Sequence, residues 1–195
     1  NDAATHFSYL PNALLQQITD PLGNSTRFEY FSDGVLKSIR DALGNVTQFE
    51  EDARGNVGAA IDTLGRRTEL TRDNAGNIVS AKDPIGRISL FSYDGQNRLV
   101  QATDPMGGVT RYEYFADGKL KSLTDAKNQK TLFTYNELGL LATQTNPMGE
   151  LEQYFYDGDK NLVRRITRNA KEIRYTYDMN NRLVEKNADG VLTQY

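Results

Sequence analysis

Apolar and polar residues alternate along short segments that recur every 21 residues. Thr26-Arg27-Phe28-Glu29-Tyr30 is followed by related segments at 110–114, 131–135 and 173–177. In each, β-branched and aromatic residues share one parity, which is typical of a strand that packs one face. A second apolar position opens another strand in every repeat. Its members are Leu15, Leu36, Val57, Ile78, Leu99, Leu120, Leu141, Leu162 and Leu183.

Two kinds of turn separate these strands. The first begins with Asp, often has Pro second and ends with Gly, which is the preference of a type I β-turn. Its anchors are Asp20, Asp41, Asp62, Asp83, Asp104 and Asp125, and its glycines are Gly23, Gly44, Gly65, Gly86, Gly107 and, after an Asn anchor, Gly149. The second turn carries Gly34, Gly55, Gly76, Gly118 and Gly139, with Asn97 and Asn181 in the same position. Gly and Asn tolerate a positive φ, whereas Lys160, the remaining member, does not fit this explanation.

Each repeat reads as strand, turn, strand, turn, and no segment shows the 3.6-residue period of a helix. The sequence therefore predicts an all-β fold. Leu36 and Ile39 are three positions apart in one strand, which predicts a bulge or a strand with two apolar faces. Two architectures fit the repeat. In an antiparallel meander of hairpins, equivalent residues are about 9 to 10 Å apart, whereas in a β-solenoid they stack at about 4.8 Å. The short turns favour hairpins.

We therefore expect residues 1–195 to form one array of about nine 21-residue hairpins, cut within a repeat at both ends. Such an array has roughly 17 strands, and accumulated strand twist predicts a long curled antiparallel sheet. The hydrophobic content of 38% predicts a thin core.

Composition excludes several classes of function. The net charge is -3 and no segment concentrates Lys or Arg, so we expect no nucleic-acid partner. The chain has no cysteine, which excludes disulfides and thiolate chemistry. No apolar run approaches the roughly 18 residues of a membrane span. The start of the chain does not resemble a signal peptide.

Candidate chemistry is sparse, and we expect no catalytic, cofactor or metal site. His6 is the only histidine and is predicted to be a surface strand residue. The aspartates recur at every turn, which favours a structural role over an acid–base role. Residues 157–161 resemble half of a calcium loop, but Leu162 replaces the required Gly and Arg168 replaces the last acidic ligand.

One row of aromatic residues occupies a single repeat position and could serve packing or ligand binding. It contains Tyr9, Tyr30, Tyr93, Tyr114, Tyr135, Tyr156 and Tyr177. Aromatic ligand-binding repeats rely heavily on Trp, which is absent here, so cross-strand packing is the favoured interpretation. The row is interrupted in the third repeat, where Glu51 and Arg72 replace Tyr and Leu70 replaces the preceding aromatic residue.

The pairs Tyr93-Asp94, Tyr156-Asp157 and Tyr177-Asp178, followed by Gly or Asn, Leu and the Asp-x-x-Gly turn, resemble the Rhs or YD repeat. The resemblance implies a β-strip that spirals into a hollow shell, as in bacterial Rhs polymorphic toxins, the cocoon of Tc toxins and the teneurins. In bacterial members this shell encloses a C-terminal toxin, and the family's self-cleaving region is not recognisable in this chain.

The resemblance implies a non-enzymatic wall segment of a secreted bacterial protein. Its implied partners are neighbouring repeats, an enclosed C-terminal effector and a delivery system such as type VI secretion. The alternative is an extracellular adhesion module that binds glycans or other ligands.

Overall fold

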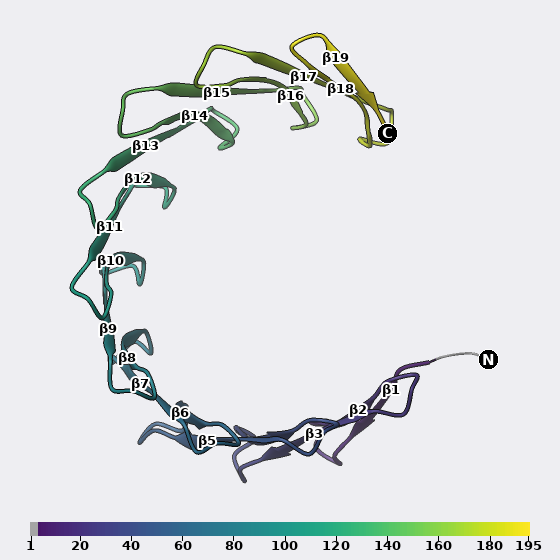
Figure 1. Cartoon of the computed structure of the whole chain (residues 1–195), viewed down its shortest axis with the longest axis vertical. Coiled ribbons are helices and arrows are strands. Elements are labelled where there is room, and N and C mark those ends of the chain that lie inside the picture. The colour runs from purple at the N-terminus through teal and green to yellow at the C-terminus, as the bar shows by residue number, and fades with distance from the viewer. Residues whose placement is uncertain (1–3) are drawn as a thin grey trace. The chain divides into compact units, whose positions relative to one another are not determined.

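The structure is a computed structural model that describes residues 4–195, and strands joined by turns make up this part of the chain (Figure 1). The strands are β1 His6–Tyr9, β2 Leu15–Thr19, β3 Ser25–Tyr30, β4 Leu36–Arg40, β5 Val46–Glu51, β6 Val57–Ile61, β7 Arg67–Arg72, β8 Ile78–Lys82, β9 Ile88–Tyr93, β10 Leu99–Thr103, β11 Val109–Tyr114, β12 Leu120–Thr124, β13 Lys130–Tyr135, β14 Leu141–Thr145, β15 Leu151–Tyr156, β16 Leu162–Ile166, β17 Glu172–Tyr177, β18 Leu183–Ala188 and β19 Val191–Gln194. The described residues thus contain two strands more than the 17 expected.

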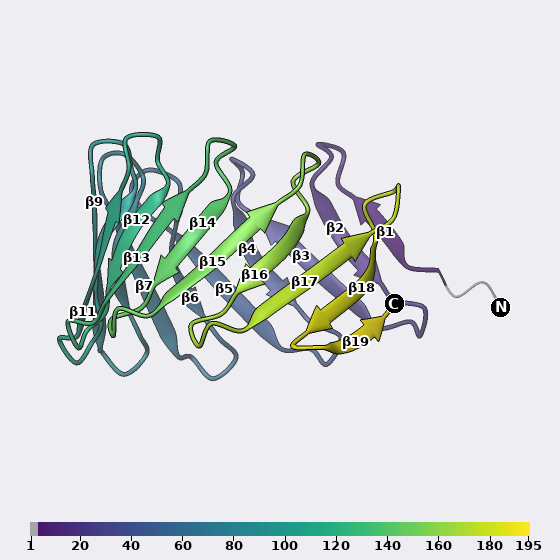
Figure 2. The ribbon, with the colours of Figure 1, turned by 90° about the horizontal axis from the view of Figure 1, so that it is seen from above.

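The chain divides into two compact units. The first comprises residues 1–98 with 103–107, and the second comprises residues 99–102 with 108–195. Within each unit every strand pairs with its neighbours in sequence, and the pairings are antiparallel. The all-β hairpin array is therefore confirmed, and a solenoid with parallel sheets is excluded. In each unit the strands form a single layer whose turns gather along two edges (Figure 2).

A bulge explains the three-residue spacing of apolar positions. Glu29 pairs with Ser38, but Tyr30 pairs with Leu36, so one extra residue is inserted in β4. The same register shift occurs where β1, β5, β7, β11, β13, β15 and β17 pair with the strand that follows each of them. The insertion reverses the alternation locally, which is how two apolar residues three apart can serve the same face. The predicted bulge is confirmed.

The turns share one geometry at both edges. The N–H of Gly23 donates to the carbonyl of Asp20 at 3.0 Å, and the N–H of Asp20 donates to the carbonyl of Asn24 at 2.9 Å. Gly23 has a φ of 86°. A type I turn followed by one left-handed residue is a common three-residue hairpin loop, so the predicted turn type is confirmed.

The final hairpin departs from this geometry. Ala188 pairs with Val191 across a two-residue turn, in which Asp189 and Gly190 both have a positive φ, of 58° and 86°. This arrangement is a type I′ turn, for which Asp-Gly is a preferred sequence. The 21-residue spacing alone does not predict it, but the dipeptide does.

Very little of the chain is buried. Among residues 4–195, Ala59 is the only buried hydrophobic residue, and Ser38, Ser122 and Glu152 are the buried polar ones. The accessible surface is 13165 Å², whereas a compact monomer of this mass exposes about 9,300 Å². The expected thin core is thus wrong, because one layer of sheet has nothing to bury its faces against. Backbone ladders, cross-strand contacts and turns hold the fold instead.

Candidate functional site

The recurring aspartates are acceptors that close their own turns. The N–H groups of Leu22 and Asn24 donate to Oδ1 of Asp20 at 2.9 and 2.8 Å, and the Asn24 side chain donates to Oδ2 at 2.8 Å. Asp41 repeats this arrangement. Asp62 does so with an arginine, whose Nε lies 2.6 Å from Oδ2. Corresponding bonds close the turns of Asp83, Asp104 and Asp125.

These donors keep the turn carboxylates ionised. The side-chain amide of Asn24 is the largest cause that lowers the pKa of Asp20 below its ordinary value of 3.8, with backbone N–H groups adding to it and desolvation opposing it. At Asp62 the largest cause is the backbone N–H of Arg66. An ionised carboxylate with its lone pairs already used is poorly suited to general acid catalysis.

The glycines of the second turn have the predicted left-handed geometry. The φ values are 93° at Gly34, 78° at Gly55, 90° at Gly76, 88° at Gly118 and 77° at Gly139. Lys160 also has a positive φ, of 70°, although its sequence offered no reason for one. Its N–H still donates to the carbonyl of Asp157 at 3.2 Å, so the loop is retained with a less suitable residue.

Four tyrosines of the row link their repeats to the preceding ones. The hydroxyl of Tyr30, at the end of β3, donates to the carbonyl of Leu15, at the start of β2, at 2.8 Å. Three other tyrosines reach a carbonyl fifteen residues earlier in the same way. These are Tyr93 to Ile78 at 2.9 Å, Tyr114 to Leu99 at 2.8 Å, and Tyr177 to Leu162 at 3.0 Å.

Where the row is interrupted the aromatic ring is lost, but the hydrogen bond to the preceding repeat is kept at one of the two positions. Arg72 stands where Tyr is expected, and its Nη1 donates to the carbonyl of Val57, again fifteen residues earlier, at 2.6 Å. Glu51, at the other irregular position, is an acceptor when ionised. Desolvation and the nearby Asp33 carboxylate raise its pKa. The sequence signal for Arg72 was its place in the row, because arginine can donate where tyrosine does.

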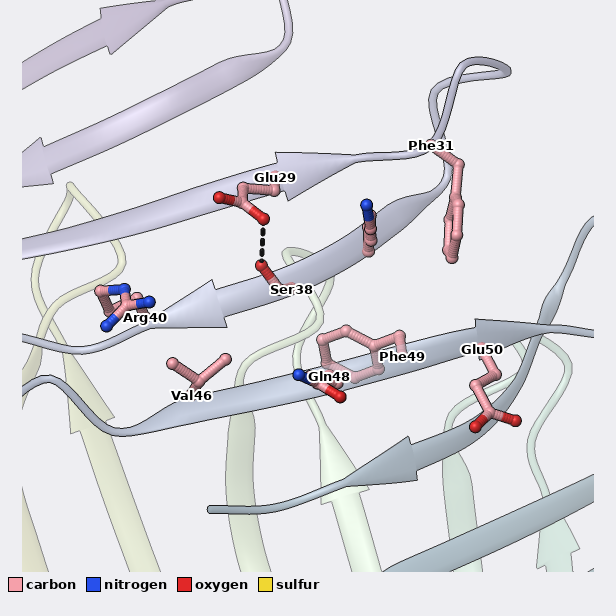
Figure 3. A pocket seen from close by; sticks show the side chains of 9 residues that line it. Glu29, Phe31, Ser38, Arg40, Val46, Gln48, Phe49 and Glu50 are labelled. Atoms are coloured by element: carbon pink, nitrogen blue, oxygen red, sulfur yellow. Dashed lines mark hydrogen bonds between the residues drawn. The ribbon is translucent and has the colours of Figure 1, made fainter. Parts of the chain in front are cut away.

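A pocket of about 450 Å³ lies over β3, β4 and β5 in the first unit (Figure 3). Ser38 donates to Glu29 at 2.9 Å inside it, and Glu50 pairs with Arg67 at 2.7 Å. Phe31 and Phe49 provide apolar surface beside these charges (Figure 3). The lining offers mixed polar and aromatic contacts but no histidine or cysteine.

A second pocket, of about 570 Å³, lies in the second unit and has a more apolar lining than the first. The rings of Phe115 and Tyr135 meet edge to face with centroids 6.2 Å apart, and the Lys119 ammonium lies 5.8 Å from the Tyr135 centroid. Asp117 pairs with the same ammonium. This is the place where the tyrosine row comes nearest to a ligand-binding surface.

Glu152 is a buried carboxylate that the repeat pattern did not single out. It is 4% exposed and pairs with Arg165 on the adjacent strand β16, while Nε of Arg168 lies 3.7 Å away. Six other repeats carry Thr at this position, so a departure from the consensus was the available signal. The ion pair joins neighbouring strands and is a structural contact.

The remaining candidates lie apart from one another. His6 is exposed on β1, as predicted. Asp157 accepts from the N–H groups of Asp159 and Asn161 at 3.0 and 2.9 Å, as in the other turns. Within residues 4–195, no three His, Cys, Asp or Glu side chains gather as a metal site would require. The same residues include no helix that could cross a membrane.

Comparison with known proteins identifies the repeat. The sequence model of the RHS Repeat matches residues 72–109, 93–114 and 116–151. No curated protein matches the chain. Among solved structures, the crystal structure of TcdB2-TccC3-Cdc42 is similar with a TM-score of 0.67 and 16% identity, over 95% of this chain and 13% of that one.

Two further structures are similar. The crystal structure of TcdB2-TccC3 has a TM-score of 0.65 at 17% identity and covers 100% of this chain and 14% of that chain. The Photorhabdus luminescens Tc holotoxin pore has a TM-score of 0.54 at 15% identity and covers 98% and 14%. The TM-scores establish a shared fold, and the chain spans only a small part of each structure. Within residues 72–151 the chain therefore matches the RHS Repeat model, and its hairpin fold is shared with these Tc toxin structures.

Proposed function

We propose that this chain is a wall segment of an Rhs/YD-repeat shell that encloses the C-terminal effector of a secreted bacterial protein. The observation that carries the proposal is the single-layered sheet, in which Ala59 is the only buried hydrophobic residue among residues 4–195. A sheet with two uncovered faces fits a wall that has cargo on one side and solvent on the other. It fits less well with a globular domain that must bury its own core.

Links between repeats support the same role. The Asn77 side chain donates to that of Asn97 at 2.9 Å, and Asn161 donates to Asn181 at 2.9 Å. Nη1 of Arg54 donates to the carbonyl of Asp73 at 2.9 Å. These bonds join turns about twenty residues apart on one edge, in addition to the tyrosine links. A wall must resist separation of its neighbouring hairpins, and such bonds provide that resistance.

In this role the chain performs no reaction. The turn carboxylates accept bonds within their own loops, and the pockets combine paired charges with aromatic rings. Its partners are then the adjoining repeats and the enclosed polypeptide, with a delivery-system protein outside. Tyrosine and phenylalanine rings can contact such a cargo without a specific sequence, because they combine apolar area with few rotamers.

The test is limited proteolysis, followed by intact mass measurement, of the full-length protein that carries this segment. We expect a C-terminal fragment to resist protease in native buffer and to become digestible when mild urea opens the repeats. Tyr30→Phe combined with Tyr93→Phe is expected to lower the urea concentration at which protection is lost. Tyr112→Phe is the matched control, because Phe28 and Phe133 occupy the same repeat position.

Immediate digestion of the C-terminal region in native buffer contradicts encapsulation. The adhesion alternative then becomes the working hypothesis. It is examined by glycan-array binding with and without Tyr135→Ala, which removes one wall of the aromatic pocket.

A further inference from the structure

One edge of the first unit carries a row of exposed apolar side chains. They are the third residues of the turns that begin at Asp20, Asp41, Asp62, Asp83 and Asp104, and we call them the apolar rim. Its members, with their exposed fractions, are Leu22 88%, Leu43 88%, Leu64 77%, Ile85 75% and Met106 96%. The second residues of three of these turns, Pro21, Pro84 and Pro105, are exposed as well.

The turn geometry does not require these residues. The corresponding positions on the opposite edge of the unit are Asp33, Arg54, Ala75 and Gln96, which are equally exposed. Turns at both edges close with the same pair of backbone bonds, as at Gly23 and Gly34. The two edges therefore differ in chemistry and not in loop type. Since an exposed Leu or Met gains nothing from water, a partner surface accounts for the row.

The spacing of the rim is regular. Equivalent turns are two strands apart, so successive members are about 9.5 to 10 Å from each other, and the row spans about 40 Å. Its five positions are symmetric about Leu64. A two-fold axis through Leu64 would place Leu43 opposite Ile85, and Leu22 opposite Met106, of a second copy. A surface with this property is self-complementary, as an isologous interface requires.

The area is sufficient for a specific contact. Five such side chains offer roughly 300 to 500 Å² of apolar surface. Two facing rims would bury roughly 600 to 1,000 Å² of apolar area, and interfaces are also about 40% polar. The total then exceeds the roughly 1,000 Å² that a specific interface needs. We propose that the apolar rim is a docking surface for a second copy of this chain, which binds rim against rim.

Sedimentation velocity over a concentration series tests this association. We expect a reversible dimer that the triple substitution Leu43→Ser, Leu64→Ser and Ile85→Ser weakens by roughly a hundredfold or more. The control places three serines on the opposite edge, as Asp33→Ser, Ala75→Ser and Gln96→Ser, and should dimerise like the wild type. Far-UV circular dichroism verifies that both triple variants are folded.

Crosslinking tests the two-fold register, because the chain contains no cysteine of its own. Leu64→Cys should form a disulfide-linked dimer on oxidation, whereas Leu22→Cys, which faces Met106, should not. A wild-type chain that is monomeric up to its solubility limit would overturn the proposal. It would equally be overturned by a triple rim variant that dimerises unchanged, by crosslinking of Leu22→Cys alone, or by a monomer that uses the rim to bind phosphatidylcholine vesicles.

Discussion

The bond that Tyr93 donates to a carbonyl fifteen residues earlier, and that Tyr30, Tyr114 and Tyr177 repeat, should stabilise the array measurably. Tyr93→Phe removes only the hydroxyl that donates to the Ile78 carbonyl at 2.9 Å and keeps the ring. A part-buried hydrogen bond of this kind contributes about 1 kcal/mol net. For a chain of this size, that loss lowers Tm by about 2 to 4 °C. Tyr30 lies three repeats away, so the double variant should lose about 2 kcal/mol.

Urea unfolding followed by far-UV circular dichroism measures the change in the midpoint and the free energy. Hydrogen exchange shows in which repeats the stability changes, since an array of repeats need not unfold in one step. The control is Tyr9→Phe, because Tyr9 is 59% exposed. If Tyr93→Phe shifts the midpoint no more than Tyr9→Phe does, the tyrosine link between repeats contributes nothing and our account of the row is wrong.

Four further outcomes are expected. Arg72→Tyr should keep the bond to the Val57 carbonyl and preserve stability, whereas Arg72→Leu should cost about 1 kcal/mol in urea unfolding. Lys160→Gly should stabilise by about 1 kcal/mol, with Lys160→Ala as a neutral control, because glycine relieves the left-handed backbone. Asp41→Ala should speed hydrogen exchange of the turn amides and Asp41→Asn should do so less, as Asn146 already holds an equivalent turn. The pKa values of Asp20, Asp41 and Asp62 are lower in the folded state than the ordinary value of 3.8. Their stabilisation is therefore complete above pH 3.8 and should be lost as pH falls below it, which acid titration of Tm would detect.

Sequence reasoning predicted most of the local structure because each hairpin is determined by short-range chemistry. The Asp20 turn, the left-handed Gly34 and the bulge beside Tyr30 all follow from residues within one repeat. The absence of a core did not follow, since the aromatic alternation of a strand is the same whether its face is covered or open. The Arg72 link was missed because an aromatic pattern treats arginine as a gap rather than as a donor. The buried Glu152 was missed because a repeat pattern is defined by the residues that the repeats share, and Glu152 departs from them.

The strand pairings and the tyrosine bonds join residues that are close in sequence, and this affects how the chain folds. Within each unit, strands pair only with their neighbours in sequence, and the tyrosine bonds extend back by fifteen residues. A fold with such low contact order closes only short loops, so it forms quickly and in small steps. Each hairpin can dock on the one before it as soon as it has left a ribosome or a membrane channel. The polypeptide can therefore fold while it is being threaded, in the order in which it emerges.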